Sequence, residues 1–226
     1  MSLSRNKAWF VFGANTDVGK TVVTAAMCRV LAAHARRVRY IKPIQTGTEM
    51  DCHTIEKNCR DSSTTTLFHW PKPISPHLAA ADYPVKNEDV LVALSSELRN
   101  PDYRNYDVFV ETAGGVLSPG PGNDRLMTQA DLYKSVGLPV IMIGDSQLGG
   151  ISTTLAALES LQRRHFQVDA VMMFENMGND TAIAALSKAP VFILPSLPDT
   201  GCLEEWHKDA LPSLIEVFQG LMGLRV

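Results

Sequence analysis

The chain has 226 residues, of which 45% are hydrophobic and 20% are charged, and its formal net charge is −3. This length suits one domain with a full core, and the balance of charges gives no basic footprint for nucleic acid. No apolar run reaches the roughly 18 residues of a membrane-spanning helix. Because the first predicted strand begins by residue 8, we expect no targeting peptide ahead of it in this sequence. We expect a single domain over residues 1–226 that is cytoplasmic, or mitochondrial if a targeting or fused segment was removed from its parent.

Apolar, β-branched runs alternate with amphipathic stretches along the chain. This alternation is typical of a parallel sheet with right-handed crossover helices. The predicted fold class is α/β, a P-loop NTPase-like, mostly parallel sheet with helices on both faces. The predicted strands are 8–13, 37–42, 107–111, 139–144, 168–174 and 191–195, and the predicted helices are 20–34, 51–59, 87–98, 127–136, 152–164, 179–187 and 203–219.

Residues 60–86 interrupt this alternation. The segment contains four prolines, Pro71, Pro73, Pro76 and Pro84, and shows no clear periodicity. We predict an extended loop that carries a function or a contact, because long loops inside a compact domain are uncommon and usually functional.

The first predicted strand runs into the sequence Gly-Ala-Asn-Thr-Asp-Val-Gly-Lys-Thr over residues 13–21, which opens the first predicted helix. Five residues separate Gly13 from Gly19, one more than in the strict P-loop pattern, so this is a variant of that loop. Backbone N–H groups and the helix end would face a phosphate, Lys20 would add charge toward the outer phosphates, and Thr21 could ligate Mg²⁺. An ordinary glycine-rich turn is the alternative; the strand–loop–helix context favours binding of a nucleoside triphosphate.

Two charged residues follow later predicted strands. In open α/β sheets, ligands bind beyond the carboxyl ends of the strands, and here these ends carry Lys42 and Glu111. With Lys20, Lys42 would flank a phosphoryl group in transfer, although a lysine at a sheet edge can also extend into solvent. With Thr21 and one more acid, Glu111 would hold a magnesium ion that keeps several waters. Asp51 is the best choice for that acid, although Asp17 is nearer the phosphates and Asp51 could instead cap its helix.

A glycine-rich loop over residues 147–153 opens another predicted helix. The N-terminus of that helix could bind a second anion, such as a substrate carboxylate. Ser152 is equally explained as a plain N-cap.

Several segments taken in chain order resemble the dethiobiotin synthetase family. The resemblance is collinear from about residue 8 to residue 200. The sequence is similar to the eukaryotic form of the family that is fused to a diaminononanoate aminotransferase. No pyridoxal-phosphate domain lies within the 226 residues. The matching segments are the loop 13–21, Tyr-Ile-Lys-Pro-Ile-Gln-Thr-Gly (40–47), Ser-Pro-His (75–77), Glu-Thr-Ala-Gly-Gly (111–115), Leu-Pro-Val (138–140) and Leu-Gly-Gly-Ile (148–151).

The resemblance implies an ATP- and Mg²⁺-dependent ring closure in biotin synthesis. An amine of 7,8-diaminononanoate takes up CO₂ as a carbamate, which attacks the γ-phosphate; the neighbouring amine then displaces phosphate and closes the ureido ring. It also implies a homodimer, with the loop near 147–153 beside the substrate carboxylate across the interface, and neither a nucleic-acid nor a membrane partner.

The resemblance also assigns residues. The implied catalytic lysines are Lys42 and Lys20, and the implied metal ligands are Thr21, Asp51 and Glu111. The implied nucleotide-binding residues are Asn15, Thr16, Asp17, Val18, Gly19, Lys20, Thr21, Val22, Asp51, Glu111, Thr112, Ala113, Gly114, Glu175, Asn176 and Pro198. The implied substrate-side residues are Thr16, Thr46, Ser118, Pro119, Gly150, Ile151 and Ser152.

Two positions depart from the family pattern. Thr112 stands where a glycine is usual. The family's Asn-Asp pair that reads adenine aligns with Glu175-Asn176 or lies one position away. A carboxylate at 175 would accept from the adenine amine but could not offer the donor of an amide.

Two other classes of protein were weighed. An amidotransferase-type ligase, such as a cobyrinate diamide synthase, needs a glutaminase portion for which the chain is too short. A partition-type ATPase switch carries an extra lysine early in its loop, where this chain has Ala14 and Asn15, and often ends in a basic amphipathic helix, whereas the last helix here contains Glu204, Glu205 and Glu216.

Overall fold

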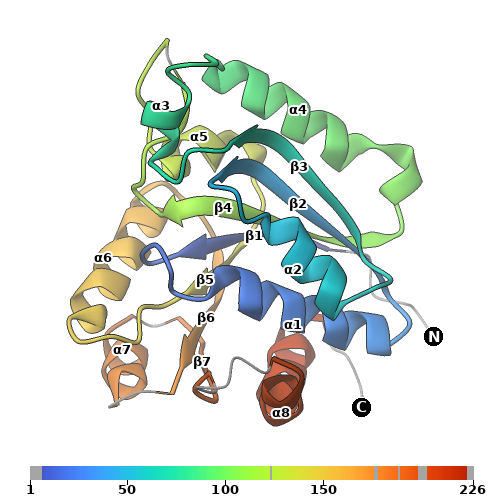
Figure 1. The fold of residues 1–226 in the computed structure, drawn as a ribbon. Helices are drawn as coiled ribbons and strands as arrows, with labels where there is room; N and C mark the ends of the chain where they lie inside the picture. The colour runs from blue at the N-terminus through green and yellow to red at the C-terminus, as the bar shows by residue number, and fades with distance from the viewer. Residues whose placement is uncertain (1–6, 123, 176–177, 188, 198–202, 223–226) are drawn as a thin grey trace.

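The computed structural model describes residues 7–122, 124–175, 178–187, 189–197 and 203–222. Within these ranges seven parallel strands form one sheet in the order β3-β2-β4-β1-β5-β6-β7 (Figure 1). The predicted α/β class and parallel sheet are therefore confirmed. The strands are β1 (Ala8–Gly13), β2 (Arg37–Thr46), β3 (Ser63–Trp70), β4 (Tyr106–Gly115), β5 (Val140–Ile143), β6 (Val168–Phe174) and β7 (Val191–Leu194).

Helices cover both faces of the sheet, each packed on its own apolar cluster. One cluster joins the sheet to α1 (Lys20–Ala33), α2 (Asp51–Asn58) and α8 (Leu203–Met222). The other joins it to α4 (Asn87–Arg99), α5 (Gln129–Tyr133), α6 (Gly150–Arg163) and α7 (Asn179–Ser187). The short helix α3 (Pro76–Ala79) lies near the end of β3 (Figure 1).

Strand β1 lies at the centre of the sheet because it is apolar on both faces. Trp9 and Val11 belong to the cluster under α1 and α8, while Phe10 and Phe12 belong to the opposite cluster. The Trp9 ring stacks on Phe109 of β4 with centroids 5.7 Å apart. A continuous apolar run of this kind is typical of a parallel strand that is buried on both sides, and it fixes the loop that follows.

The prediction of a loop over residues 60–86 is wrong in part, since this segment contains strand β3 and helix α3. Strand β3 lies at the edge of the sheet, and within the described part of the chain it pairs only with β2. Most of its side chains are half-buried, and Thr64, Thr65 and Thr66 follow one another, so neither an apolar run nor a clear alternation marks it.

Strands β2 and β4 extend further than predicted, to Thr46 and Gly115. Lys42 and Glu111 therefore lie inside strands rather than beyond their ends. Strand β2 continues because it keeps pairing with β3, from Arg39 opposite Ser63 to Thr46 opposite Trp70, after its pairing with β4 has stopped.

Candidate active site

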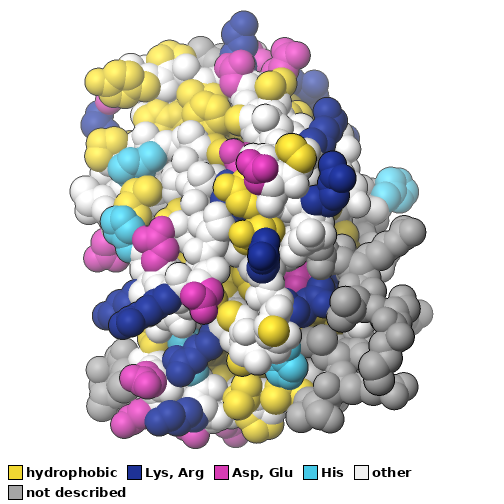
Figure 2. Space-filling model, turned by 90° about the vertical axis from the view of Figure 1, so that its right-hand side faces the viewer, with side chains coloured by type: hydrophobic (Ala, Val, Ile, Leu, Met, Phe, Trp, Pro, Cys, Tyr) yellow, Lys and Arg dark blue, Asp and Glu magenta, His cyan; other side chains and the backbone are white. Residues whose placement is uncertain are grey.

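A cleft opens where β2 and β4 separate. The last register pair between them is Ile41 with Val110, and the next residues, Lys42 and Glu111, face each other across the gap. The cleft has a volume of about 720 Å³ and is bounded by β2, β4, the start of α2 and the loop between β1 and α1. The opposite face of the molecule, at the amino ends of the strands, carries interspersed acidic and basic side chains (Figure 2).

The loop between β1 and α1 has the backbone of a phosphate cradle. Gly19 adopts a φ of +86° and α1 begins at Lys20, so the free N–H groups of the first helical turn border the loop. A Cβ on Gly19 would lie 2.5 Å from the ring of Phe174, so both its backbone angle and its neighbour require glycine. Earlier in the loop, the Thr16 N–H donates to Asn15 Oδ1 at 2.8 Å.

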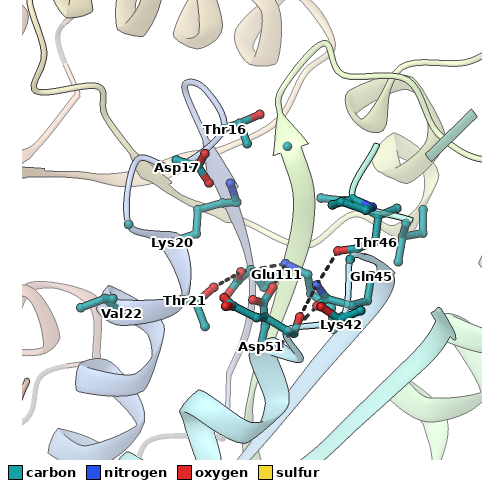
Figure 3. Close-up of a pocket in the computed structure, with 18 of the residues that line it drawn as sticks. Thr16, Asp17, Lys20, Thr21, Val22, Lys42, Gln45, Thr46, Asp51 and Glu111 are labelled. Atoms are coloured by element: carbon teal, nitrogen blue, oxygen red, sulfur yellow. Dashed lines mark hydrogen bonds and ion pairs between the residues drawn. The ribbon is translucent and has the colours of Figure 1, made fainter. Parts of the chain in front are cut away.

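Three charged side chains meet at the floor of the cleft (Figure 3). The Lys42 Nζ atom lies 2.6 Å from Asp51 Oδ2 and 2.8 Å from Glu111 Oε1. Lys42 is only 4% exposed and Glu111 is fully buried. Thr21 Oγ1 donates to the same Glu111 oxygen at 2.8 Å, which links the cluster to the first turn of α1.

These contacts exclude two of the alternatives considered for the sequence, solvent exposure of Lys42 and helix capping by Asp51. Lys42 does not extend into solvent, because its ammonium is enclosed by carboxylates. Asp51 is not an N-cap: the cap of α2 is Met50, which makes no side-chain capping bond, and the Asp51 carboxylate turns to Lys42 instead.

The two lysines of the cleft differ in their electrostatic surroundings. Burial and, after it, the charge of Lys42 lower the pKa of Lys20 to about 8, although Glu111 and Asp51 act in the opposite direction. Burial also acts to lower the pKa of Lys42, but Glu111 and Asp51 more than offset it, so that pKa lies above its ordinary value. The protonated form of Lys42 is therefore stabilised by its two carboxylates, whereas the protonated form of Lys20 would be stabilised by a bound anion.

The residues predicted to bind magnesium lie together. Glu111 Oε2 is buried without a hydrogen-bond partner among the described residues, and the Asp51 carboxylate and Thr21 hydroxyl lie beside it. No group of three or more His, Cys, Asp or Glu side chains within the described ranges could hold a metal by itself. Two carboxylates and a hydroxyl suit Mg²⁺, which commonly takes one or two carboxylates and completes its shell with waters and substrate phosphates.

A second cleft of about 900 Å³ lies on the other side of the phosphate loop. Of the predicted residues, Asn15, Val18 and Glu175 line it, and Thr16, Asp17 and Gly19 border both clefts. The first cleft also receives most of the other predicted residues, namely Lys20, Thr21, Val22, Lys42, Thr46, Asp51, Glu111, Ala113 and Gly114. Most of the residues predicted for the phosphate end of the site therefore line one of these two clefts.

Some predicted residues line neither cleft. Thr112 is buried, and its hydroxyl donates to the carbonyl of Val11. Ser118 Oγ accepts from the Gly115 N–H at 2.8 Å and thereby shapes the turn after β4. Pro119, Gly150, Ile151 and Ser152 also lie outside both clefts, and Asn176 and Pro198 lie outside the described residues.

The loop before α6 is built differently from the prediction. Helix α6 begins at Gly150, two residues early, and its N-cap is Gly149 with a φ of +88°, so Ser152 is not the cap. A Cβ on Gly150 would lie only 1.9 Å from the carbonyl oxygen of Asp145, so the chain needs glycine there. Asp145 ties this loop to the phosphate loop, because its carboxylate accepts from Gln147 N–H and from the Asn15 amide.

Sequence reasoning missed several lining residues. Gln45 is buried: its amide donates to the carbonyls of Thr46 and Glu49, and its oxygen accepts from Asp51 N–H, which holds the turn before α2. Gln45 lay within the segment 40–47 that resembled the family, which was the available signal. The other missed residues of the first cleft are Ile44, Gly47, Thr48, Glu49, Pro73 and Leu197.

A phosphate cradle at the central strand of a parallel sheet, with two lysines and two carboxylates at the same edge, defines a P-loop nucleotide-binding protein. The family model described as an AAA domain matches residues 7–205. MinD from the MinC:MinD complex of Aquifex aeolicus shares the fold, with a TM-score of 0.62 over 97% of both chains at 13% identity.

The chain belongs to the dethiobiotin synthetase family. It is 32% identical to the ATP-dependent dethiobiotin synthetase BioD of Cytophaga hutchinsonii over 74% of this chain and 76% of that protein. It is 39% identical, over 75% of its length, to the bifunctional dethiobiotin synthetase/adenosylmethionine-8-amino-7-oxononanoate aminotransferase of Emericella nidulans, of which it covers 22%. The chain thus spans about a fifth of that bifunctional relative. No described helix is both long and apolar enough to cross a membrane.

Proposed function

We propose that this chain is a cyclo-ligase that closes the ureido ring of dethiobiotin from 7,8-diaminononanoate, CO₂ and ATP. The observation that carries the proposal is the buried cluster at the gap between β2 and β4, where Lys42, Asp51 and Glu111 meet the Thr21 hydroxyl of the phosphate loop. Membership of the dethiobiotin synthetase family supports the choice of substrates.

The proposed reaction has three steps. One amine of the substrate adds to CO₂ and loses a proton, giving a carbamate. A carbamate oxygen attacks the γ-phosphorus of ATP, the bond to the bridging oxygen breaks, and ADP leaves. The second amine then attacks the carbamate carbon, and inorganic phosphate leaves as the ring closes.

The residues of the cleft would act mainly by holding charge in place. The phosphate loop and Lys20 would bind the outer phosphates, and Lys42 would stabilise the negative charge that develops on the transferring phosphoryl group and the carbamate. Such fixed cations need no reorganisation during the reaction. Magnesium, when bound by Asp51, Glu111 and Thr21, would neutralise charge on the phosphate oxygens.

The second cleft would take the remainder of the nucleotide. Glu175 lines it, and its carboxylate would accept a hydrogen bond from the amine of adenine. The cytoplasmic location stays a prediction; two plant relatives carry the word mitochondrial in their names.

The activity can be tested by phosphate release from ATP and Mg²⁺ with bicarbonate. We expect release only when 7,8-diaminononanoate is present. Lys42→Gln should lower turnover by at least about 100-fold, the usual effect of removing one preorganised charge donor. Lys72→Gln, at an exposed lysine paired with Asp82, is the matched control and should leave turnover unchanged.

Two results would contradict this proposal. Phosphate release that does not depend on the diamine would favour a nucleotide-gated switch. Near-normal turnover in Lys42→Gln would remove Lys42 from the mechanism.

A further inference from the structure

The Lys42 ammonium lies where the divalent cation would find its protein ligands. Both of its short contacts are to carboxylates, at 2.6 Å to Asp51 and 2.8 Å to Glu111, and a third, at 3.4 Å, is to the carbonyl oxygen of Thr112. All three partners are oxygen atoms, the ligand type that Mg²⁺ and Mn²⁺ prefer.

The second lysine of the cleft is not held in this way. Lys20 Nζ lies 3.5 Å from the carbonyl of Asn15, within the phosphate loop, and makes no ion pair within 4 Å to a described carboxylate. Of the two lysines, it is therefore Lys42 that shares its carboxylates with any metal ion that enters the cleft.

The cluster already contains positive charge without a metal. The Lys42 ammonium lies between the two negative charges of Asp51 and Glu111, and Lys20 and Asp17 line the same cleft. A divalent ion on the same carboxylates would come within a few ångströms of the Lys42 ammonium, in surroundings that are buried and therefore weakly screened. Two cations at that distance repel strongly unless further negative charge arrives with the metal. The phosphates of a nucleotide would bring that charge.

We propose that, in the nucleotide-free protein, the Lys42 ammonium is a built-in surrogate for the divalent cation. It offsets part of the negative charge of Asp51 and Glu111 and excludes free metal from them until a nucleotide supplies phosphate oxygens. Lys42 then leaves the carboxylates to the metal, and its flexible stem turns the ammonium toward the phosphates. This inference rests on the proposed function only for the role of the released lysine; the exclusion of metal needs no turnover.

The test is a titration of nucleotide-free protein with Mn²⁺ alone, followed by electron paramagnetic resonance of the free ion. Lys42→Met keeps much of the apolar stem and uncovers the two carboxylates, so it should bind Mn²⁺ at least tenfold more tightly than the wild type. Lys72→Met uncovers one exposed carboxylate, Asp82, and should bind as the wild type does. Adding Asp51→Asn to Lys42→Met should abolish the gain.

Two further measurements keep the test decisive if Lys42→Met is poorly stable. Mn²⁺ should raise the Tm of Lys42→Met toward that of the wild type, while the wild-type Tm stays unchanged. Lys42→Arg retains the positive charge and should still exclude Mn²⁺. Equal Mn²⁺ affinity in wild type and Lys42→Met, or tight binding by Lys42→Arg, would overturn the proposal. The wild-type assay for diamine-dependent phosphate release tests the proposed function separately.

Discussion

Lys42 is buried because the sheet opens beside it. Strand β2 leaves β4 after Ile41, so the side chain of the next residue enters the gap instead of packing against a neighbouring strand. An unpaired ammonium would be very unfavourable there, and Asp51 and Glu111 offset that cost. The same opening therefore creates both the space for a phosphoryl group and the cluster that holds the charges.

His207, which lies far from the cleft, should make the stability of the fold depend on pH. It lies on α8, and its Nδ1 accepts from Arg29 of α1 at 3.2 Å. Burial, and then the charge of Arg29, lower the pKa of His207 from 6.5 to about 4, so the folded protein keeps this ring neutral. The unfolded chain takes up the proton near pH 6.5. Stability should therefore be complete above pH 6.5 and fall as the pH drops toward 4.

We expect His207→Gln to flatten the dependence of Tm on pH between 6.5 and 4. His53→Gln, at an exposed histidine of α2, is the control and should leave the slope as in the wild type. An unaltered slope in His207→Gln would show that this ring does not titrate as described.

At the scale of residues, the sequence identified the charged groups but not their pairing. Lys42 and Glu111 follow apolar runs, which placed them at the carboxyl edge of the sheet. That Lys42 contacts Asp51 depends on where β2 separates from β4 and on how α2 begins, and neither is encoded in local periodicity. The same holds for Thr112, whose hydroxyl bonds to β1, a strand about 100 residues earlier.

At the scale of elements, two glycines in helices should respond oppositely to alanine. Gly220 in α8 is exposed, and an added Cβ would meet nothing within 4 Å, so Gly220→Ala should stabilise the fold by about 0.5–1 kcal/mol. In Gly150→Ala the new Cβ would meet the Asp145 carbonyl at 1.9 Å, so the start of α6 must shift and stability should fall.

Urea denaturation checks both substitutions, since the midpoint should rise for Gly220→Ala and fall for Gly150→Ala. A lower midpoint for Gly220→Ala would mean that the end of α8 is not held as a regular helix.

Helices and central strands were predictable from their own apolar patterns, but the edge strand β3 was not. Helix α7 was predicted over 179–187 and is found there, because its apolar positions repeat at helical spacing. Strand β3 was missed because it is only half-buried and owes its conformation to pairing with β2. Edge strands depend on a partner that local sequence does not reveal.

At the scale of the whole molecule, we propose a homodimer. Exposed leucines stand in the two loops that hold the predicted substrate-side residues: Leu117 is 50% exposed, Leu126 is 65% exposed and Leu148 is 98% exposed. The resemblance to the family implies a homodimer with the loop near 147–153 at its interface, and Leu148 stands in that loop. A second copy placed on these loops would bring Ser118 and Ser152, which line neither cleft of their own chain, toward a substrate.

We expect light scattering after size exclusion to give twice the chain mass for the wild type. Leu148→Asp should shift the mass toward that of a single chain and raise the KM for the diamine, because a charge would be buried in the interface. Val92→Asp, at a comparably exposed position on α4, is the control. A wild-type protein with the mass of one chain would contradict the dimer.

The central position of β1 also governs the order in which the protein can assemble during synthesis. Strand β1 is translated well before both of its neighbours in the sheet: Ala8 aligns with Val108, and Phe10 aligns with Val140. Until β5 has been translated, the phosphate loop has no strand on one side to hold it. A nascent chain that is stalled before residue 140 should consequently be unable to retain nucleotide, however complete its first hundred residues are.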